Sequence, residues 1–140
     1  MVENSRRRPI GVTVLAAVAG IGGVAAVLVS LGLVVGLIDI AAIGGGFGFP
    51  AGISSTSAGL GVLAYSVGGL AFAYGAWTLK TWGWPLGIVF FGASAVSDGL
   101  AAILGWVGLA IAIVQIAIAG LVLYYWLRPE VRAAFGRSGS

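Results

Sequence analysis

Asp98 is the one acidic residue that lies well inside a long apolar segment of this sequence. A charged side chain at the centre of a bilayer costs about 2.5–3.5 kcal/mol on insertion scales, so such residues mark candidate functional sites whose partner has to be identified. No basic residue lies at the same depth in the other apolar segments. We therefore expect the Asp98 carboxyl to be protonated, wetted or hydrogen-bonded.

Several polar residues are expected at the depth of Asp98. Gly105 and Trp106 predict a tight turn, and in the antiparallel hairpin that it closes, positions whose numbers sum to about 212 or 213 lie opposite each other. Asp98 is then level with Gln115, the only amide inside an apolar segment. Neighbours one helical turn away, and residues at equal depth in the second segment, extend this layer. The candidate polar cluster consists of Asp98, Gln115, Ser94, Ser97, Tyr65 and Ser66.

Three interpretations of the cluster compete. The first is an interhelical hydrogen bond between Asp98 and Gln115 that fixes the bundle; such bonds average about 0.6 kcal/mol. The second is a binding or permeation site for a proton, a cation or a small polar solute. The third, an enzyme active site, is disfavoured because one carboxylate without a second acid, a base or a metal ligand is too little. The chain has neither Cys nor His, so we expect no enzyme activity, no cofactor and no metal site. A remaining alternative is that Asp98 reaches the outer membrane border and has little effect.

Composition indicates that membrane-spanning helices position these residues. Charged residues make up 8% of the chain, hydrophobic residues 60%, and the mean hydropathy is +1.12. Soluble domains carry about 25% charged residues, so the apolar surface here must face lipid. About 20 apolar residues suffice to cross a bilayer. The sequence predicts one all-α domain over 1–140, an integral membrane four-helix bundle with spans at about 10–36, 57–79, 85–104 and 107–127. A cleaved signal peptide is the alternative for the first span, but its apolar run exceeds the usual length of about 7–15 residues.

The basic residues predict how the four spans are oriented. With four spans, all seven lie on one side: Arg6, Arg7, Arg8, Lys80, Arg128, Arg132 and Arg137. Such an excess marks the cytoplasmic face. We therefore expect both termini and the tail 128–140 in the cytoplasm, the loop 40–56 outside, and the protein in the cell membrane. The residues expected to anchor this border are Lys80, Trp82, Trp84, Tyr124, Tyr125 and Arg128. The pI of about 9.8 follows from this border, and a net charge of only +3 gives no reason to expect a nucleic-acid partner.

The first and third spans align without a gap at an offset of 76 residues. Over twenty positions, eight are identical: Pro9, Gly11, Ala17, Ala19, Gly23, Ala25, Ala26 and Leu28 recur 76 residues later. The second and fourth spans match more weakly, with Trp77 paired to Trp126. The pattern predicts two duplicated transmembrane hairpins related by a pseudo-two-fold axis along the membrane normal. The alternative is coincidence between sequences rich in alanine and glycine.

Two border motifs carry a resemblance. The stretch from Gly75 to Gly87 contains the pattern Trp-x-Leu-Lys-x-Trp-x-Trp, and the stretch from Tyr124 to Gly136 contains Tyr-Tyr-x-x-Arg-Pro-x-Val. Both resemble the border motifs of a family of small four-span membrane proteins of archaea and bacteria. The resemblance implies the four-span topology and a prokaryotic source, and it implies no activity and no site residue. In the tail, we expect Val131 and Phe135 to face lipid from an interfacial segment.

The sequence thus predicts a non-enzymatic membrane protein, a structural or accessory subunit that acts through helix or lipid contacts. Its expected partners are the lipid bilayer and either a second copy of the chain or another membrane protein. The alternative is a small channel or transporter for a proton, a cation or a small polar solute, which would use the polar layer around Asp98.

Overall fold

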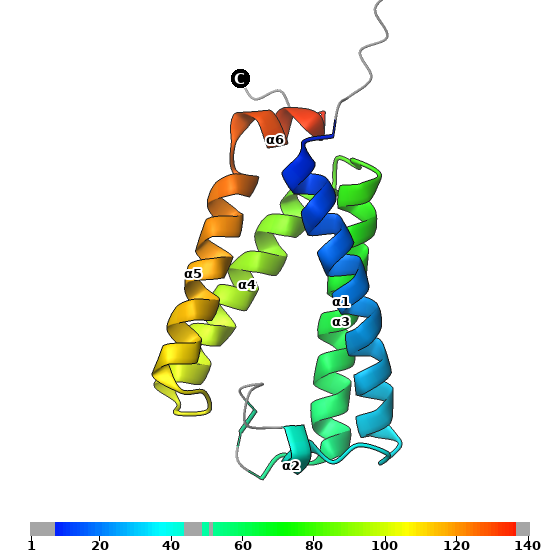
Figure 1. Cartoon of the computed structure of the whole chain (residues 1–140), viewed down its shortest axis with the longest axis vertical. Coiled ribbons are helices and arrows are strands. Elements are labelled where there is room, and N and C mark those ends of the chain that lie inside the picture. The colour runs from blue at the N-terminus through cyan, green and yellow to red at the C-terminus, as the bar shows by residue number, and fades with distance from the viewer. Residues whose placement is uncertain (1–7, 44–48, 51, 137–140) are drawn as a thin grey trace, which may run out of the picture.

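The computed structural model describes residues 8–43, 49–50 and 52–136, and these residues form helices and no strand. The helices are α1 (Ile10–Val34), α2 (Ile40–Ile43), α3 (Ser55–Trp77), α4 (Gly83–Ile103), α5 (Leu109–Trp126) and α6 (Pro129–Ala134). Four of them, α1, α3, α4 and α5, are long and apolar enough to cross a membrane. They pack together, which confirms the predicted all-α four-helix bundle (Figure 1).

The helix ends differ from the predicted spans by a few residues. The first helix stops at Val34, two residues before the predicted end, and the third begins at Gly83, two residues earlier than predicted. Pro85 therefore lies in the first turn of α4, where the missing N–H costs no helical hydrogen bond. The predicted loop 40–56 contains the short helix α2, and part of this loop, 44–48 and 51, lies outside the described residues.

Glycine in a left-handed conformation ends α1 and α4. Gly36 has a φ of 78° and Gly105 a φ of 74°. At the end of α4, the Trp106 N–H returns to the Ala101 carbonyl at 2.8 Å, which closes the hydrogen-bonded turn that commonly ends a helix. This turn reverses the chain within a few residues and brings α5 back alongside α4.

A buried aromatic core joins all four long helices at the end of the bundle that carries α6, called the α6 end below. The rings of Phe72, Trp126 and Phe135 are fully buried there. Trp126 packs against Phe72 at a centroid distance of 5.0 Å and against Phe135 at 5.2 Å. Trp84 donates its indole N–H to the Trp126 carbonyl at 3.1 Å, and Trp126 returns the bond to the Trp84 carbonyl at 2.9 Å. These reciprocal bonds satisfy both indole donors and fix the start of α4 to the end of α5.

Helix α6 lies across this end of the bundle (Figure 1). Our expectation that Val131 and Phe135 face lipid is wrong, because their exposed fractions are 1% and 0% and both belong to the aromatic core. An amphipathic helix can bury its apolar face either in lipid or in a protein core. In this protein the apolar side chains of α6 pack into the aromatic core. Residues 128–136 of the predicted tail therefore cover the bundle, while 137–140 lie outside the described residues.

Small residues allow α1 and α3 to pack closely. A Cβ atom added to Gly59 would lie 2.9 Å from the Ser30 carbonyl oxygen, and one added to Gly23 would lie 2.8 Å from the Leu70 side chain. Close backbone approach through small residues is the usual way for membrane helices to associate, because lipid is as apolar as the helix surface. This pair therefore forms a compact first hairpin.

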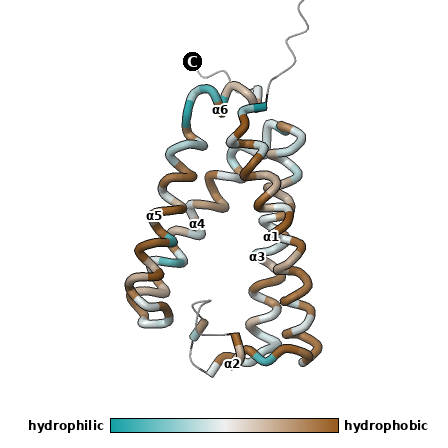
Figure 2. The backbone as a smooth tube through the Cα atoms, in the orientation of Figure 1, coloured by the Kyte–Doolittle hydropathy of each residue, from teal (hydrophilic) through white to brown (hydrophobic). Residues whose placement is uncertain are grey.

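The second hairpin, α4 and α5, draws away from the first toward the opposite end, called the α2 end below (Figure 1). At the α2 end it has a small buried cluster of its own, formed by Ala101, Val107 and Ala112, separate from the aromatic core. Figure 2 shows hydrophobic residues along all four long helices, with hydrophilic segments at α6, beside α2 and within the second hairpin. The bundle is thus tightly joined at one end and divided into two hairpins at the other.

Candidate polar site between the hairpins

Asp98 lies on the face of α4 that is turned toward the other helices. Gly87 on this face contacts Trp126 and Phe72, and the residues at helical spacing after it are Phe91, Ser94 and Asp98. All three are half-buried, whereas the opposite face of α4 is exposed. Spacings of three and four residues keep side chains on one side of a helix, so Ser94 and Asp98 point toward the bundle interior.

Gln115 lies at the same level on α5. It is half-buried and stands between buried Ala112 and buried Ala119 on the face of α5 that meets α4. The two hairpin helices touch at Gly87 with Trp126, and Ala112 shares a cluster with Ala101 near the turn. Both pairs have residue numbers that add up to 213, the spacing that also places Asp98 opposite Gln115.

The hydrogen bond expected between Asp98 and Gln115 does not form. Among the described residues, neither the Asp98 carboxyl nor the Gln115 side-chain amide has a hydrogen-bond or ion-pair partner. The register of the hairpin is therefore compatible with the predicted bond, but the two side chains leave their polar atoms available to a third group.

Tyr65 and Ser94 are the members of the predicted cluster that do meet. The Tyr65 hydroxyl and Ser94 Oγ lie 3.2 Å apart, and Ser94 also donates to the Phe90 carbonyl at 2.9 Å. The Tyr65 ring packs on Phe90 at a centroid distance of 4.9 Å. Tyr65 nevertheless remains 56% exposed. This contact is a polar link between α3 and α4 about midway along the spans.

Ser66 and Ser97 lie apart from the cluster. Ser66 is buried between α1 and α3, and its hydroxyl donates to the Val62 carbonyl of its own helix at 2.6 Å. Ser97 is exposed and makes no side-chain hydrogen bond to a described residue. Both residues are at the predicted depth, but the rotation of their helices turns them away from Asp98.

The approach to Asp98 differs at the two ends of the bundle. Toward the α6 end, the site is followed by Phe90 and Phe91, whose rings pack edge to face, and then by Phe72 and Trp126. Toward the α2 end the second hairpin draws away from the first (Figure 1). Within the described part of the chain, no group of three Asp, Glu, His or Cys residues is placed to hold a metal ion.

The predicted border anchors gather at the α6 end but divide into two kinds. Lys80, Trp82 and Tyr124 are exposed, as expected of interfacial residues, and Arg128 stacks its guanidinium on Tyr124 at 5.7 Å. Trp84 and Tyr125 instead pack against the aromatic core.

Two further contacts at this end did not emerge from the sequence. Arg8 lies 4.4 Å from the centroid of the Trp77 ring, and Arg132 lies 5.4 Å from that of Trp84. Each joins residues that are far apart in the sequence, so only the packed structure reveals it.

Comparison of the chain with protein-family models, with curated proteins and with solved structures finds no match, so the functional argument rests on the residues themselves.

Proposed function

We propose that this protein is a non-enzymatic accessory subunit that binds another membrane component through helix contacts between its two hairpins. The observation that supports this most is that the Asp98 carboxyl, on the face of α4 turned toward the other helices, has no hydrogen-bond or ion-pair partner among the described residues. Buried polar groups in membrane proteins are normally hydrogen-bonded across helices. A partner that supplies a hydrogen-bond donor to Asp98 and Gln115 would complete this layer.

The aromatic core argues for a docking role over conduction. A path along the bundle axis from Asp98 to the α6 end would have to pass Phe72 and Trp126, which are fully buried and packed against each other. Separating those rings would also disturb the reciprocal Trp84–Trp126 hydrogen bonds. Opening of such a path therefore requires loss of the contacts that hold the four helices together.

Photo-crosslinking in the native membrane tests the docking role. Benzoylphenylalanine in place of Tyr65 places the reactive group at the separation of the hairpins, and the same group in place of Val67 puts it at equal depth on an exposed position of the same helix. We expect a discrete protein adduct from position 65 and lipid adducts alone from position 67. Equal adducts from both positions, or none from position 65, would contradict the proposal.

A small transporter is the second candidate. Two features favour it: Asp98 and Gln115 lie at the same depth on α4 and α5, and the aromatic core closes the bundle at the α6 end. Purified protein in liposomes distinguishes the two functions. An accessory subunit gives proton and cation flux no higher than empty liposomes. Flux that exceeds this background and disappears in Asp98→Asn, while the variant stays folded, would establish transport instead.

We also propose that the protein lies in the cell membrane with the α6 end in the cytoplasm, because the helix bounds put the described basic residues Arg8, Lys80, Arg128 and Arg132 at that end. The chain has no cysteine, so single exposed positions can be labelled. We expect an impermeant thiol reagent added to intact cells to label Thr56→Cys, at the start of α3, but to label Thr81→Cys, in the α3–α4 turn, only after lysis. The reverse pattern would invert the orientation.

A further inference from the structure

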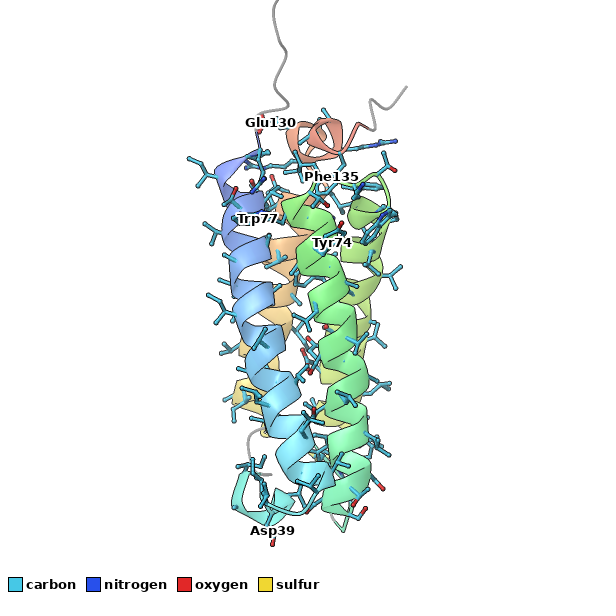
Figure 3. All side chains as sticks on the ribbon, turned by 90° about the vertical axis from the view of Figure 1, so that its right-hand side faces the viewer. Asp39, Tyr74, Trp77, Glu130 and Phe135 are labelled. Carbon is cyan, nitrogen blue, oxygen red and sulfur yellow. The ribbon has the colours of Figure 1, made fainter. Side chains whose placement is uncertain are left out.

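The α6 end of the bundle carries a concentration of positive charge that the described acidic residues do not neutralise. The described cations there are Arg8, Lys80, Arg128 and Arg132, and Glu130 is the one described acid beside them. Asp39 lies at the opposite end, as Figure 3 shows, and Asp98 lies within a span. None of the four cations forms an ion pair with a described residue.

Three of these cations are held against aromatic rings. The Arg8 guanidinium lies 4.4 Å from the Trp77 centroid, Arg132 lies 5.4 Å from Trp84, and Arg128 lies 5.7 Å from Tyr124. A ring covers one face of the planar guanidinium and leaves its charge in place. The N–H groups project from the edge of that plane, where they match two oxygens of a phosphate. The rings therefore hold guanidiniums in fixed positions without using their donors.

The Arg8 side chain has a buried hydrogen-bond donor that no described residue pairs with. Its Nε atom is buried and has no hydrogen-bond partner among the described residues. A buried donor without an acceptor is costly, and an ordered water or a bound ion is one way in which such a donor is satisfied. An anionic oxygen beside Arg8 would satisfy this donor and the charge together.

The aromatic and aliphatic side chains at the α6 end indicate which class of molecule supplies this anionic oxygen. Trp77 and Tyr124 are 50% and 68% exposed. Exposed aliphatic side chains adjoin the arginine–ring pairs in sequence: Ile10 follows Arg8 by two residues, and Leu121 lies one helical turn before Tyr124. Aromatic rings of this kind lie at the headgroup level of a bilayer, with acyl chains beside the aliphatic surface. A soluble phosphate uses only the cations, whereas a phospholipid uses both surfaces.

We propose that the α6 end binds anionic phospholipids, whose phosphates are held by the ring-stacked guanidiniums of Arg8, Arg128 and Arg132. This site lies at the α6 end and not between the hairpins, so the lipid-binding proposal does not depend on the proposed accessory function. Lys80 contributes general attraction at the same surface, but no ring fixes its position.

Thermal unfolding of the purified full-length chain tests the site. The protein in a neutral detergent is titrated with phosphatidylglycerol, with phosphatidylcholine or with inorganic phosphate, and the lipid concentration that gives half of the stabilisation is measured. We expect stabilisation by phosphatidylglycerol alone. Arg8→Gln should raise its half-point about tenfold, the factor expected for the loss of one hydrogen bond between charged groups.

Two variants separate a built site from diffuse charge. Lys80→Gln removes the same charge from the same end, and we expect its half-point to change less than twofold. Arg8→Lys keeps the charge and loses the planar fork, and it should behave like Arg8→Gln. Equal effects of Arg8→Gln and Lys80→Gln, normal binding by Arg8→Lys, or equal stabilisation by phosphatidylcholine or inorganic phosphate would each overturn the proposal.

Discussion

At the residue scale, Gly87 shows how one missing side chain allows the helices to meet. A Cβ atom added there would lie 2.5 Å from Trp126 Nε1 and 2.9 Å from the Phe72 ring. Neither ring has room to withdraw, because both are fully buried and Trp126 is held by hydrogen bonds at its indole N–H and its carbonyl. Gly92, five residues later on the same helix, has no atom within 4 Å of the added Cβ.

Gly87→Ala is therefore expected to destabilise the bundle by about 1–3 kcal/mol, the usual cost of overpacking. Gly92→Ala should leave the free energy of unfolding unchanged or raise it by up to about 1 kcal/mol, because alanine is the better helix former. Unfolding in mixed micelles with increasing denaturing detergent measures both. A loss of stability in Gly92→Ala as large as that in Gly87→Ala would show that the aromatic core is not the origin of the effect.

The polar side chains have smaller effects on stability. Tyr65→Phe removes the one bond that joins members of the predicted cluster, and we expect a loss of about 0.6 kcal/mol, the average for interhelical hydrogen bonds in a membrane. Asp98→Asn breaks no bond between described residues, so the free energy of unfolding of the isolated protein should stay unchanged. A larger loss in Asp98→Asn than in Tyr65→Phe, measured in the same micelles, would restore Asp98 as a structural clamp.

At the scale of the elements, the end of α3 departs from the pattern of α1 and α4. Its final turn closes with the Lys80 N–H on the Gly75 carbonyl at 3.0 Å and the Leu79 N–H on the Ala76 carbonyl at 3.4 Å. Leu79 occupies the position after α3 that Gly36 occupies after α1 and Gly105 after α4, and its φ is 51°. Its side chain packs against the aromatic core, which offsets the unfavourable backbone conformation.

At position 79 we therefore expect glycine to destabilise the protein less than alanine, which is the reverse of the usual order within a helix. Both substitutions lose the packing of the leucine, but glycine also removes the left-handed strain. We expect Leu79→Gly to be more stable than Leu79→Ala by about 1 kcal/mol. Leu86 packs on the same core within α4, and there the glycine variant should be less stable than the alanine variant by about 1 kcal/mol. The same order at both positions, in unfolding titrations of all four variants, would rule out strain at Leu79.

Hydropathy and turn residues predicted the four long helices, and the turn at Gly105 predicted the level of Asp98 and Gln115. The rotation of each helix was not predictable, since hydropathy hardly differs around helices that are apolar on every side; Ser66 and Ser97 were misplaced for this reason. Val131 and Phe135 were misplaced because an apolar pattern fits lipid and a protein core equally well. Hydropathy also could not predict that the hairpins separate toward the α2 end, because an apolar helix face fits lipid and another helix equally well.

The proposed duplication remains a prediction, but contacts within the two hairpins are consistent with it. In the first hairpin Arg8 stacks on Trp77, and in the second Trp84 bonds to Trp126. These are corresponding positions in the alignment at the offset of 76 residues and in the pairing of Trp77 with Trp126. The same register at the same border is expected if one hairpin arose by copying the other.

At the scale of the whole molecule, the two ends of the bundle differ in what holds the hairpins together. At the α6 end, α1, α3, α4, α5 and α6 share one buried core. At the α2 end, the cluster of Ala101, Val107 and Ala112 belongs to the second hairpin alone. Local stability follows shared buried contacts, so the α2 end has less resistance to relative motion of the hairpins.

We therefore expect each hairpin to move as a unit about the core at the α6 end. Spin labels at Val35, directly after α1, and at Leu104, directly after α4, report the distance across the α2 end. Labels at Ile10 and Leu127 report the distance across the α6 end. All four positions are exposed, and the chain has no cysteine to remove. In lipid nanodiscs, the distance distribution of the first pair should be clearly broader than that of the second. Distributions of equal, narrow width would mean that the bundle is rigid along its whole length, and a partner placed between the hairpins would then need a preformed space rather than an opening one.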